Sequence, residues 1–241
     1  MIIRQLFDSG SSTYTYLLGC EATRQAIVVD PVLEMIERDL AELISLNLRL
    51  TCTVETHVHA DHVTAAWQLR ERTGCRVAYP AMEQVACADL QLAVDQPLMA
   101  GSVLLLPLPT PGHTAGHHCY LLEHPVPMVF TGDTLLIDGC GRTDLDGGDA
   151  ETLFRSVHDR LFALPEETLV YPGHDYNQRR VSTIAQERAR NQRLKDGVSA
   201  DQFVQIMAGL DLPPPAKMAT AVPANRGCGR CPRSAAARAD A

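Results

Sequence analysis

The strongest constraint on this chain is a run of seven residues, Thr56-His57-Val58-His59-Ala60-Asp61-His62, which holds three histidines and an aspartate. It directly follows residues 50–54, an apolar and β-branched stretch that predicts a strand. Side chains alternate between the faces of a strand, so His57 and His59 are expected to project to the same side at its end. The chain must then turn, which can bring Asp61 and His62 back toward the same point. Imidazoles and a carboxylate that converge in this way predict a site for a divalent metal ion.

Three more candidate ligands follow later strands of the chain, and a glycine precedes each of them. Glycine permits the tight turns that bring a loop close to a bound ion. Each of the three, taken alone, reads as an ordinary loop histidine or a capping aspartate. Together with the first motif they predict one metal-binding constellation. The three residues are His113, Asp133 and His174.

The rest of the pattern predicts strands alternating with helices. The predicted strands are 13–18, 25–30, 50–54, 76–79, 103–108, 119–122, 128–131 and 168–171, and the predicted helices are 33–44, 63–72, 151–163, 181–190 and 201–210. The signal between residues 81 and 100 is weak, and the Pro-, Ala- and Arg-rich tail from Leu212 shows no core pattern. Strands grouped toward both ends of the body, with helices between them, predict two sheets packed face to face with helices outside. The metal site is expected on the loops at one end of these sheets.

Composition excludes several classes of function. The 241 residues suit one domain, and a net charge of -8 with a pI near 5.5 argues against a nucleic-acid surface. Apolar runs such as residues 103–106 are far too short to cross a bilayer. Residues 1–5 lack the basic-then-apolar order of a secretion signal. We therefore expect a cytoplasmic protein with no membrane partner.

Eight cysteines are scattered along the chain, and without a secretion signal they are expected to be reduced thiols. Cys228 and Cys231 form one CxxC pair, which leaves open a third kind of function, a metal-containing redox or binding module. One pair is weak evidence for a zinc site, and a redox pair usually stands at a helix start. Cys140 lies near Arg142, which could lower its pKa, although packing is the better interpretation. The cysteines are Cys20, Cys52, Cys75, Cys87, Cys119, Cys140, Cys228 and Cys231.

The sequence His-Val-His-Ala-Asp-His, followed in order by His113, Asp133 and His174, resembles the metallo-β-lactamase superfamily over residues 1 to about 190. The resemblance implies an α+β fold, a four-layer αββα sandwich with the metal at one edge of the two sheets. We expect one catalytic domain over residues 1–229, with C-terminal helices from about residue 181. A flexible tail over residues 230–241 is expected to follow it.

Within that superfamily, residues 130–133, 139–142 and 171–174 are similar to both glyoxalase II and the persulfide dioxygenases, the ethylmalonic-encephalopathy protein family. Three features favour the dioxygenases. Thr143-Asp144 follows Arg142, and Asp175-Tyr176 follows His174. The third is a short C-terminus with Ala221-Val222-Pro223-Ala224-Asn225 and then Cys228-Gly229, in place of the long helical substrate domain of glyoxalase II.

The dioxygenase resemblance implies one Fe(II) per chain, held by two histidines and a carboxylate, His57, His113 and Asp133, with positions left for substrate sulfur and O2. It implies sulfide oxidation, in which glutathione persulfide and O2 give sulfite and glutathione. A homodimer is suggested by the resemblance alone. The remaining motif residues would orient the ligands or hold a second metal: His59, Asp61, His62 and His174. The candidates for binding the glutathione carboxylates are Arg142, Tyr176 and Arg193.

The alternative is a dizinc hydroxyacylglutathione hydrolase of the glyoxalase II type, in which a metal-bound hydroxide attacks a thiolester carbonyl. The same seven histidines and aspartates could furnish two adjacent zinc sites. Residue counting leaves the metal and the carrier thiol open. One iron per chain is expected for the dioxygenase, and two zinc ions per chain for the hydrolase.

Overall fold

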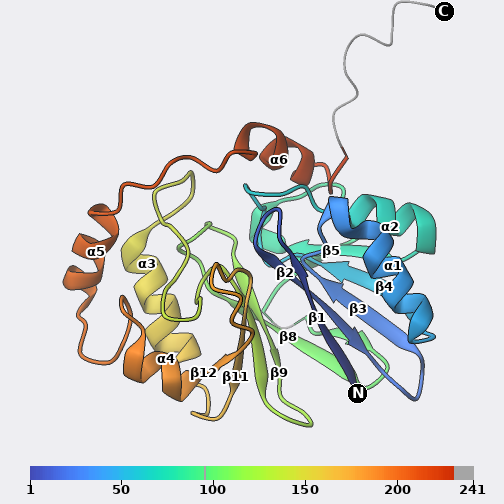
Figure 1. The fold of residues 1–241 in the computed structure, drawn as a ribbon, viewed down its shortest axis with the longest axis horizontal. Helices are drawn as coiled ribbons and strands as arrows, with labels where there is room; N and C mark the ends of the chain where they lie inside the picture. Colours follow the sequence, from blue (N-terminus) through green and yellow to red (C-terminus); the bar gives the residue numbers. More distant parts are fainter. Residues whose placement is uncertain (95, 231–241) are drawn as a thin grey trace, which may run out of the picture.

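Two six-stranded mixed sheets pack face to face, and helices cover their outer faces (Figure 1). The computed structural model describes residues 1–94 and 96–230. This arrangement confirms the expected four-layer αββα sandwich. Within the described residues, no helix has the length and apolar character needed to cross a bilayer.

The first sheet carries the N-terminal half of the chain in sequence order, from β1 to β6. Its first three strands pair antiparallel, and its last four pair parallel. The strands are β1 (Ile2–Asp8), β2 (Thr13–Gly19), β3 (Gln25–Val29), β4 (Arg49–Val54), β5 (Arg76–Pro80) and β6 (Leu90–Leu92).

The second sheet has the order β12-β11-β10-β9-β8-β7, and only β10 and β11 pair parallel in it. These two strands therefore end at the same edge of the sheet. The strands are β7 (Leu98–Ala100), β8 (Val103–Pro109), β9 (His118–Leu122), β10 (Met128–Gly132), β11 (Leu169–Pro172) and β12 (Ser182–Thr183).

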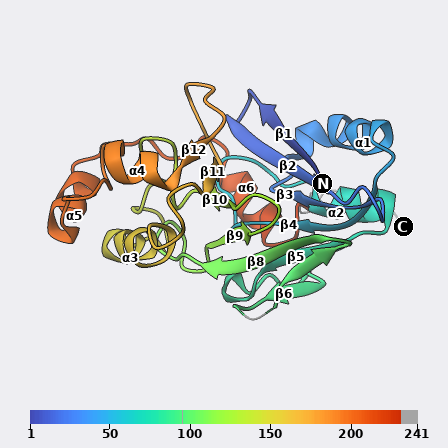
Figure 2. The same cartoon turned by 90° about the horizontal axis from the view of Figure 1, so that it is seen from below.

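The main core lies between the sheets, where Tyr16 and Val54 of the first sheet meet Leu105, Tyr120 and Phe130 of the second. These side chains are essentially buried, which removes a large apolar area from water. The first sheet's outer face is covered by α1 (Ile36–Ser45), after a 3₁₀ turn (Leu33–Met35), and by α2 (Ala66–Thr73). The second sheet's outer face is covered by α3 (Ala150–Arg155), α4 (Ile184–Arg190) and α5 (Ala200–Ala208) (Figure 2).

Several predicted helix boundaries were wrong. The helix predicted over 181–190 begins at Ile184, because Ser182–Thr183 form β12, and the helix predicted over 33–44 is α-helical only from Ile36. The helix predicted from residue 63 begins at Ala66, because Thr64 is used elsewhere: its hydroxyl donates to Glu55 and its N–H donates to Asn225. The helix predicted over 151–163 is α-helical only as far as Arg155 and continues as a π-helical segment, Ser156–Leu161.

The prediction that the tail from Leu212 lacks core residues was also wrong. The tail contains α6 (Met218–Asn225), which buries Ala221, Ala224 and Asn225. In Figure 1, α6 lies above the sheets, between α5 on one side and α2 on the other. Between residues 81 and 100 the structure has a 3₁₀ turn (Ala81–Glu83) and the short strands β6 and β7.

The prediction that every cysteine is a reduced thiol is corrected at one pair. Cys87 and Cys228 form a disulfide across 141 residues of sequence. It links the loop after the Ala81–Glu83 turn to the segment after α6. No sequence pattern indicates that these two segments lie close together. Cys231 and the tail over 231–241 lie outside the described residues. Arg230 lies over the ring of Trp67, with its guanidinium 4.0 Å from the ring centre.

Candidate metal centre

The ends of three strands bring three of the predicted ligands together at one edge of the sandwich. His57 follows β4, His113 follows β8 and Asp133 follows β10. One donor atom from each of these three residues lies within 4.8 Å of the others. The His113 Nε2 is 3.5 Å from the Asp133 carboxylate. The predicted convergence of these three residues is therefore present in the fold.

The local hydrogen bonds of His57 leave its Nε2 free to bind a metal. The Thr56 hydroxyl donates a hydrogen bond to the Asp30 carboxylate over 2.9 Å. The Thr56 oxygen therefore accepts a hydrogen bond from His57 Nδ1, also at 2.9 Å. Burial and the neighbouring histidines hold the pKa of His57 well below its usual value. A neutral imidazole with its proton on Nδ1 presents a lone pair on Nε2, the form that coordinates metals.

His113 and Asp133 are prepared in the same way. His113 Nδ1 donates to the Arg142 carbonyl oxygen over 2.7 Å, which leaves Nε2 as the lone-pair nitrogen. The backbone N–H of Asp133 donates to His117 Nε2 over 3.1 Å, and the buried Oδ1 of Asp133 has no hydrogen-bond partner within the described residues. Two imidazole lone pairs and an unsatisfied carboxylate oxygen in a buried cluster fit a divalent metal ion.

Gly132 makes this approach possible. Its φ is +47°, and a Cβ atom there would lie 2.6 Å from His117 Nε2 and 2.7 Å from the Thr56 hydroxyl. An L-residue would therefore be strained and would clash with two groups that hold the ligands in place. The glycine before Asp133 allows β10 to end against the motif loop.

His59 is held differently from His57, although the two rings lie 4.1 Å apart. Its Nε2 is 3.2 Å from both the Asp30 and Glu55 carboxylates, and all three residues are buried. Burial alone would lower the pKa of His59, but the two carboxylates raise it well above its usual value. An imidazolium between two carboxylates has no lone pair on that nitrogen, so the Nε2 of His59 is not free to bind a metal in this arrangement.

Asp61, His62 and His174 lie beside the three-residue cluster. The Oδ2 of Asp61 is 3.2 Å from the Thr13 hydroxyl, 3.0 Å from His62 Nδ1 and 3.6 Å from His174 Nε2. Burial would raise the pKa of Asp61, yet His62 and His174 lower it well below its usual value. His174 Nε2 is also 3.5 Å from Asp133 Oδ1, so this group adjoins the cluster directly.

A cavity of about 610 Å³ opens onto the cluster, and all three predicted carboxylate binders line it. Tyr176 is 75% exposed, and its ring is parallel to that of His174 with 6.2 Å between centres. Arg142 is already engaged by the Asp144 carboxylate, with two contacts of 2.6 Å. Arg193 donates to the Cys140 carbonyl oxygen and forms no ion pair with any described residue. Arg193 is therefore the cation most available to an incoming carboxylate.

Arg193, rather than Arg142, is also the cation beside Cys140. The Arg193 guanidinium lies 3.8 Å from the Cys140 sulfur. Burial nevertheless raises the pKa of Cys140 to about 11, so the suggested lowering by a guanidinium is not what dominates. Cys140 packs in the core beneath α3 and α5, as the packing interpretation expects.

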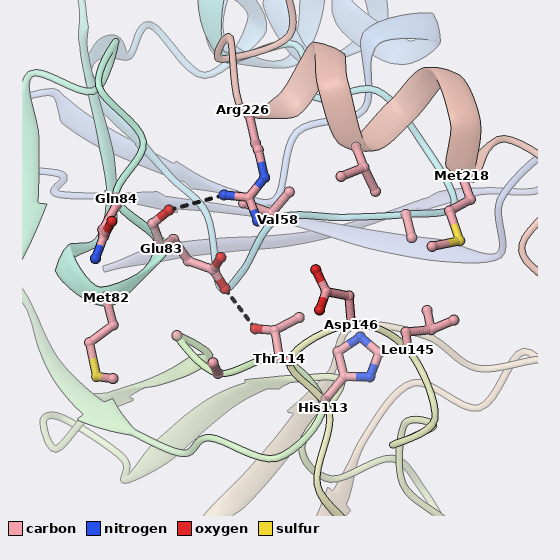
Figure 3. Close-up of a pocket in the computed structure, with 15 residues that line it drawn as sticks. Val58, Met82, Glu83, Gln84, His113, Thr114, Leu145, Asp146, Met218 and Arg226 are labelled. Carbon is pink, nitrogen blue, oxygen red and sulfur yellow. Dashed lines mark hydrogen bonds between the residues drawn. The ribbon is translucent and has the colours of Figure 1, made fainter.

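A second cavity, of about 330 Å³, lies on the other side of His113 (Figure 3). The Thr114 hydroxyl donates to Glu83, and Arg226 donates to the Glu83 carbonyl oxygen. One wall is formed by Met218 and Arg226 from α6 and from the residue that follows it. The C-terminal helix thus lies next to the loop that carries His113, one of the predicted metal ligands.

Four residues that contact the predicted ligands or their loop escaped prediction from the sequence: Asp30, Glu55, His117 and Asn225. Asp30 directly follows β3 and Glu55 directly follows β4, and the predicted ligands also lie at or shortly after strand ends. This position at a strand end was the sequence signal that could have identified them. His117 closes the same glycine- and histidine-containing loop as His113. Asn225 lies in the tail, where the sequence offered no pattern at all.

Comparisons with known proteins agree with this geometry. A model of the metallo-beta-lactamase superfamily matches residues 9–174. The human protein named persulfide dioxygenase ETHE1, mitochondrial, is 44% identical over 95% of this chain and 89% of its own length. The crystal structure of ETHE1 from Myxococcus xanthus matches with a TM-score of 0.92 and 50% identity, over 95% of this chain and all of that one. A hydroxyacylglutathione hydrolase of Pseudomonas putida is 38% identical over 69% of this chain and 63% of its own length.

Proposed function

The chain belongs to the metallo-beta-lactamase superfamily, and from that premise we propose that it is a persulfide dioxygenase. In the proposed reaction, glutathione persulfide, O2 and one water molecule give glutathione, sulfite and two protons. The enzyme's cofactor in this proposal is one non-haem Fe(II) per chain, and residues 1–229 act as one catalytic unit. The similarity to proteins named persulfide dioxygenase covers 95% of the chain, whereas the similarity to proteins named hydroxyacylglutathione hydrolase covers 69–78% of it.

One observation carries the proposal: His57, His113 and Asp133 converge with both imidazoles in the form that presents a lone pair. Two histidines and a carboxylate are the usual ligands of non-haem iron oxygenases. When bound there, Fe(II) would supply a redox-active centre with coordination positions open to sulfur and O2. The chain's own contribution is to fix the tautomers of both histidines and the direction of the carboxylate.

The surroundings of His59 bear on whether the site holds one metal ion or two. A second ion in the alternative scheme would draw on His59, Asp61, His62 and His174. His59 Nε2 is already held by Asp30 and Glu55, and Asp61 Oδ2 already faces His62, His174 and Thr13. Donor atoms of His59, Asp61 and His62 nevertheless lie within 4.8 Å of one another, and the buried His59 Nδ1 and His62 Nε2 have no hydrogen-bond partner among the described residues. The number of metal ions bound per chain is therefore the measurement that separates the two schemes.

The cavity supports a thiol carrier that bears carboxylates. Its volume of about 610 Å³ suits a tripeptide-sized ligand. Arg193 would pair with one carboxylate of glutathione, and Tyr176 would donate a hydrogen bond at the rim. Arg142 donates hydrogen bonds to the carbonyl oxygens of Leu212 and Pro213. Its part is therefore to fix the segment between α5 and α6 that forms one wall of this cavity. These contacts would place the persulfide sulfur toward His57, His113 and Asp133.

Oxygen uptake tests the proposal. Fe(II)-loaded protein is expected to consume O2 when glutathione persulfide is added, with sulfite formed in step, and to bind one iron per chain. S-lactoylglutathione is the matched control substrate, because it presents the same carrier with a thiolester. Thiolester hydrolysis by protein that binds two zinc ions, with no oxygen uptake by the iron form, would establish the hydrolase instead.

A further inference from the structure

Asn225 is a fully buried polar residue at the end of α6, far from the metal motif in sequence. Its side-chain Nδ2 donates to the carbonyl oxygens of His59 and His62, over 2.9 and 2.8 Å. Its Oδ1 accepts the backbone N–H of Thr64 over 2.9 Å. Both amide protons and the amide oxygen are therefore used on one loop, the loop between β4 and α2.

These three bonds fix the backbone that presents the metal motif. Residues 59–64 carry no regular secondary structure, so their carbonyl groups depend on partners outside the loop. Asn225 is also held through its backbone, because its carbonyl oxygen accepts a hydrogen bond from the Tyr79 hydroxyl over 3.3 Å. Because both the backbone and the side-chain amide of Asn225 are hydrogen-bonded, this residue can hold the loop in one conformation.

The segment after α6 is fastened to the same region. Cys228 is bonded to Cys87, and its carbonyl oxygen accepts the Trp67 backbone N–H over 2.9 Å. Gly229 has a φ of +85°, and a Cβ there would lie 2.1 Å from the Thr64 carbonyl oxygen. Only glycine lets the chain pass so close to the loop. The disulfide and this close approach keep Asn225 against residues 59–64.

We propose that Asn225 is a positioning residue for the metal centre, fixing residues 59–64 through its side-chain amide, and that the Cys87–Cys228 disulfide holds it in place. The inference rests on the proposed metal site but not on the identity of the reaction. It assigns to the C-terminal helix a part in metal binding that the ligand set itself does not reveal.

The test is Co(II) binding by the full chain carrying Asn225→Asp. Aspartate keeps the acceptor for Thr64 but replaces the group that donates to His59 and His62, so an oxygen then faces two carbonyl oxygens. We expect Co(II) affinity, measured by chelator competition, to fall at least about tenfold, and the visible Co(II) spectrum to shift. Wild-type affinity together with a wild-type spectrum would overturn the proposal.

Two controls separate positioning from general stability. Leu43→Ala weakens the packing of α1 far from the loop, and Glu34→Gln removes the ion pair between Glu34 and Lys217 at the start of α6. Both are expected to bind Co(II) within about twofold of wild type. If Leu43→Ala lowers affinity as much as Asn225→Asp, then the effect is one of stability and the positioning role fails.

Cys87→Ser serves if Asn225→Asp does not fold, because it leaves Asn225 intact and removes only the covalent link. We expect Co(II) to leave this variant at least threefold faster, and the Thr64 amide to exchange with solvent faster. Unchanged rates would refute the role of the disulfide. Co(II) binding is read without substrate, so an inactive protein that still shows these effects would reject the dioxygenase function and keep the positioning role.

Discussion

His57 and His59 are two residues apart and their rings lie close together, tilted by 51°, yet their nitrogens face different groups. His57 turns its Nδ1 to a hydroxyl and its Nε2 toward the ligand cluster, whereas His59 turns its Nε2 to two carboxylates. Alternation along the chain predicts that both rings share one side, and it is correct. What separates their chemistry is the buried pair Asp30 and Glu55, whose positions depend on the pairing of β3 with β4.

The two histidines should therefore respond differently to substitution. His57→Ala is expected to abolish stoichiometric iron binding, because it removes a ligand. His59→Gln retains hydrogen-bonding groups near Asp30 and Glu55 and should keep one iron per chain, with affinity lowered roughly 10–100-fold. Metal analysis and chelator competition measure both. Equal loss of iron in the two variants would mean that His59 is itself a ligand.

Arg193 is the residue on which substrate affinity should depend most. Loss of a hydrogen-bonded charge pair costs about 1.5–3 kcal/mol, which corresponds to roughly 10–100-fold in binding. Arg193→Ala is therefore expected to raise KM for glutathione persulfide by that factor and to change kcat little. Steady-state oxygen uptake gives both constants. Arg190→Ala is the matched control, since Arg190 pairs with Asp138 and is not among the residues that line the cavity.

At the scale of elements, α1 carries a buried carboxyl that opposes folding at neutral pH. Asp39 is fully buried with one oxygen on Arg38, and burial raises its pKa to about 6 from 3.8. A raised pKa means that the unfolded chain releases this proton first. The contribution of Asp39 to stability is thus most favourable below pH 4 and is lost as pH rises to about 6.

Asp39→Asn removes this titration. We expect the variant to be more stable than wild type at pH 7 by about 2–3 kcal/mol, and similar to wild type at pH 4. Urea unfolding at the two pH values measures the difference. A gain of the same size at pH 4 and pH 7 would show that the benefit comes from packing or from Arg38 and not from the ionised carboxyl.

Elements with a strong apolar period were predictable, and the others were not. The helix over 33–44 and the strands that end in ligands follow from the spacing of large apolar residues. In α6 the buried residues are Ala221, Ala224 and Asn225, two of them small and one polar, so no apolar stripe marks the helix. The strands β6 and β7 have three residues each, too few for alternation to show.

For the whole molecule, the convergence of His57, His113 and Asp133 could be predicted from the sequence because each follows a strand and strand ends gather at one edge. The residues that contact the motif from elsewhere, Asp30 and Asn225, could not be predicted, since their positions depend on which segments become neighbours in the fold. Asp30 meets the motif because β3 lies beside β4, and Asn225 meets it because the tail folds back across the sandwich. The disulfide depends on the same return of the chain.

The Cys87–Cys228 disulfide should contribute to global stability. It closes a loop of 141 residues, and constraint of the unfolded chain by such a loop is worth about 2–5 kcal/mol. Reduction of wild-type protein is expected to lower the urea midpoint accordingly. Cys87→Ser should unfold at the lower midpoint with or without reductant. A wild-type urea midpoint that is the same with and without reductant would contradict this expectation.

The division of the ligands between two sheets bears on how the protein is made. His57 leaves the ribosome with the first sheet, but His113 and Asp133 belong to the second, and Asn225 comes after both. A nascent chain shorter than about 133 residues cannot assemble the ligand set, and one that lacks its last helix cannot hold the motif loop. In the proposed scheme, the full ligand set can therefore bind Fe(II) only after Asp133 has been synthesised, and Asn225 can hold the motif loop only once α6 has been made.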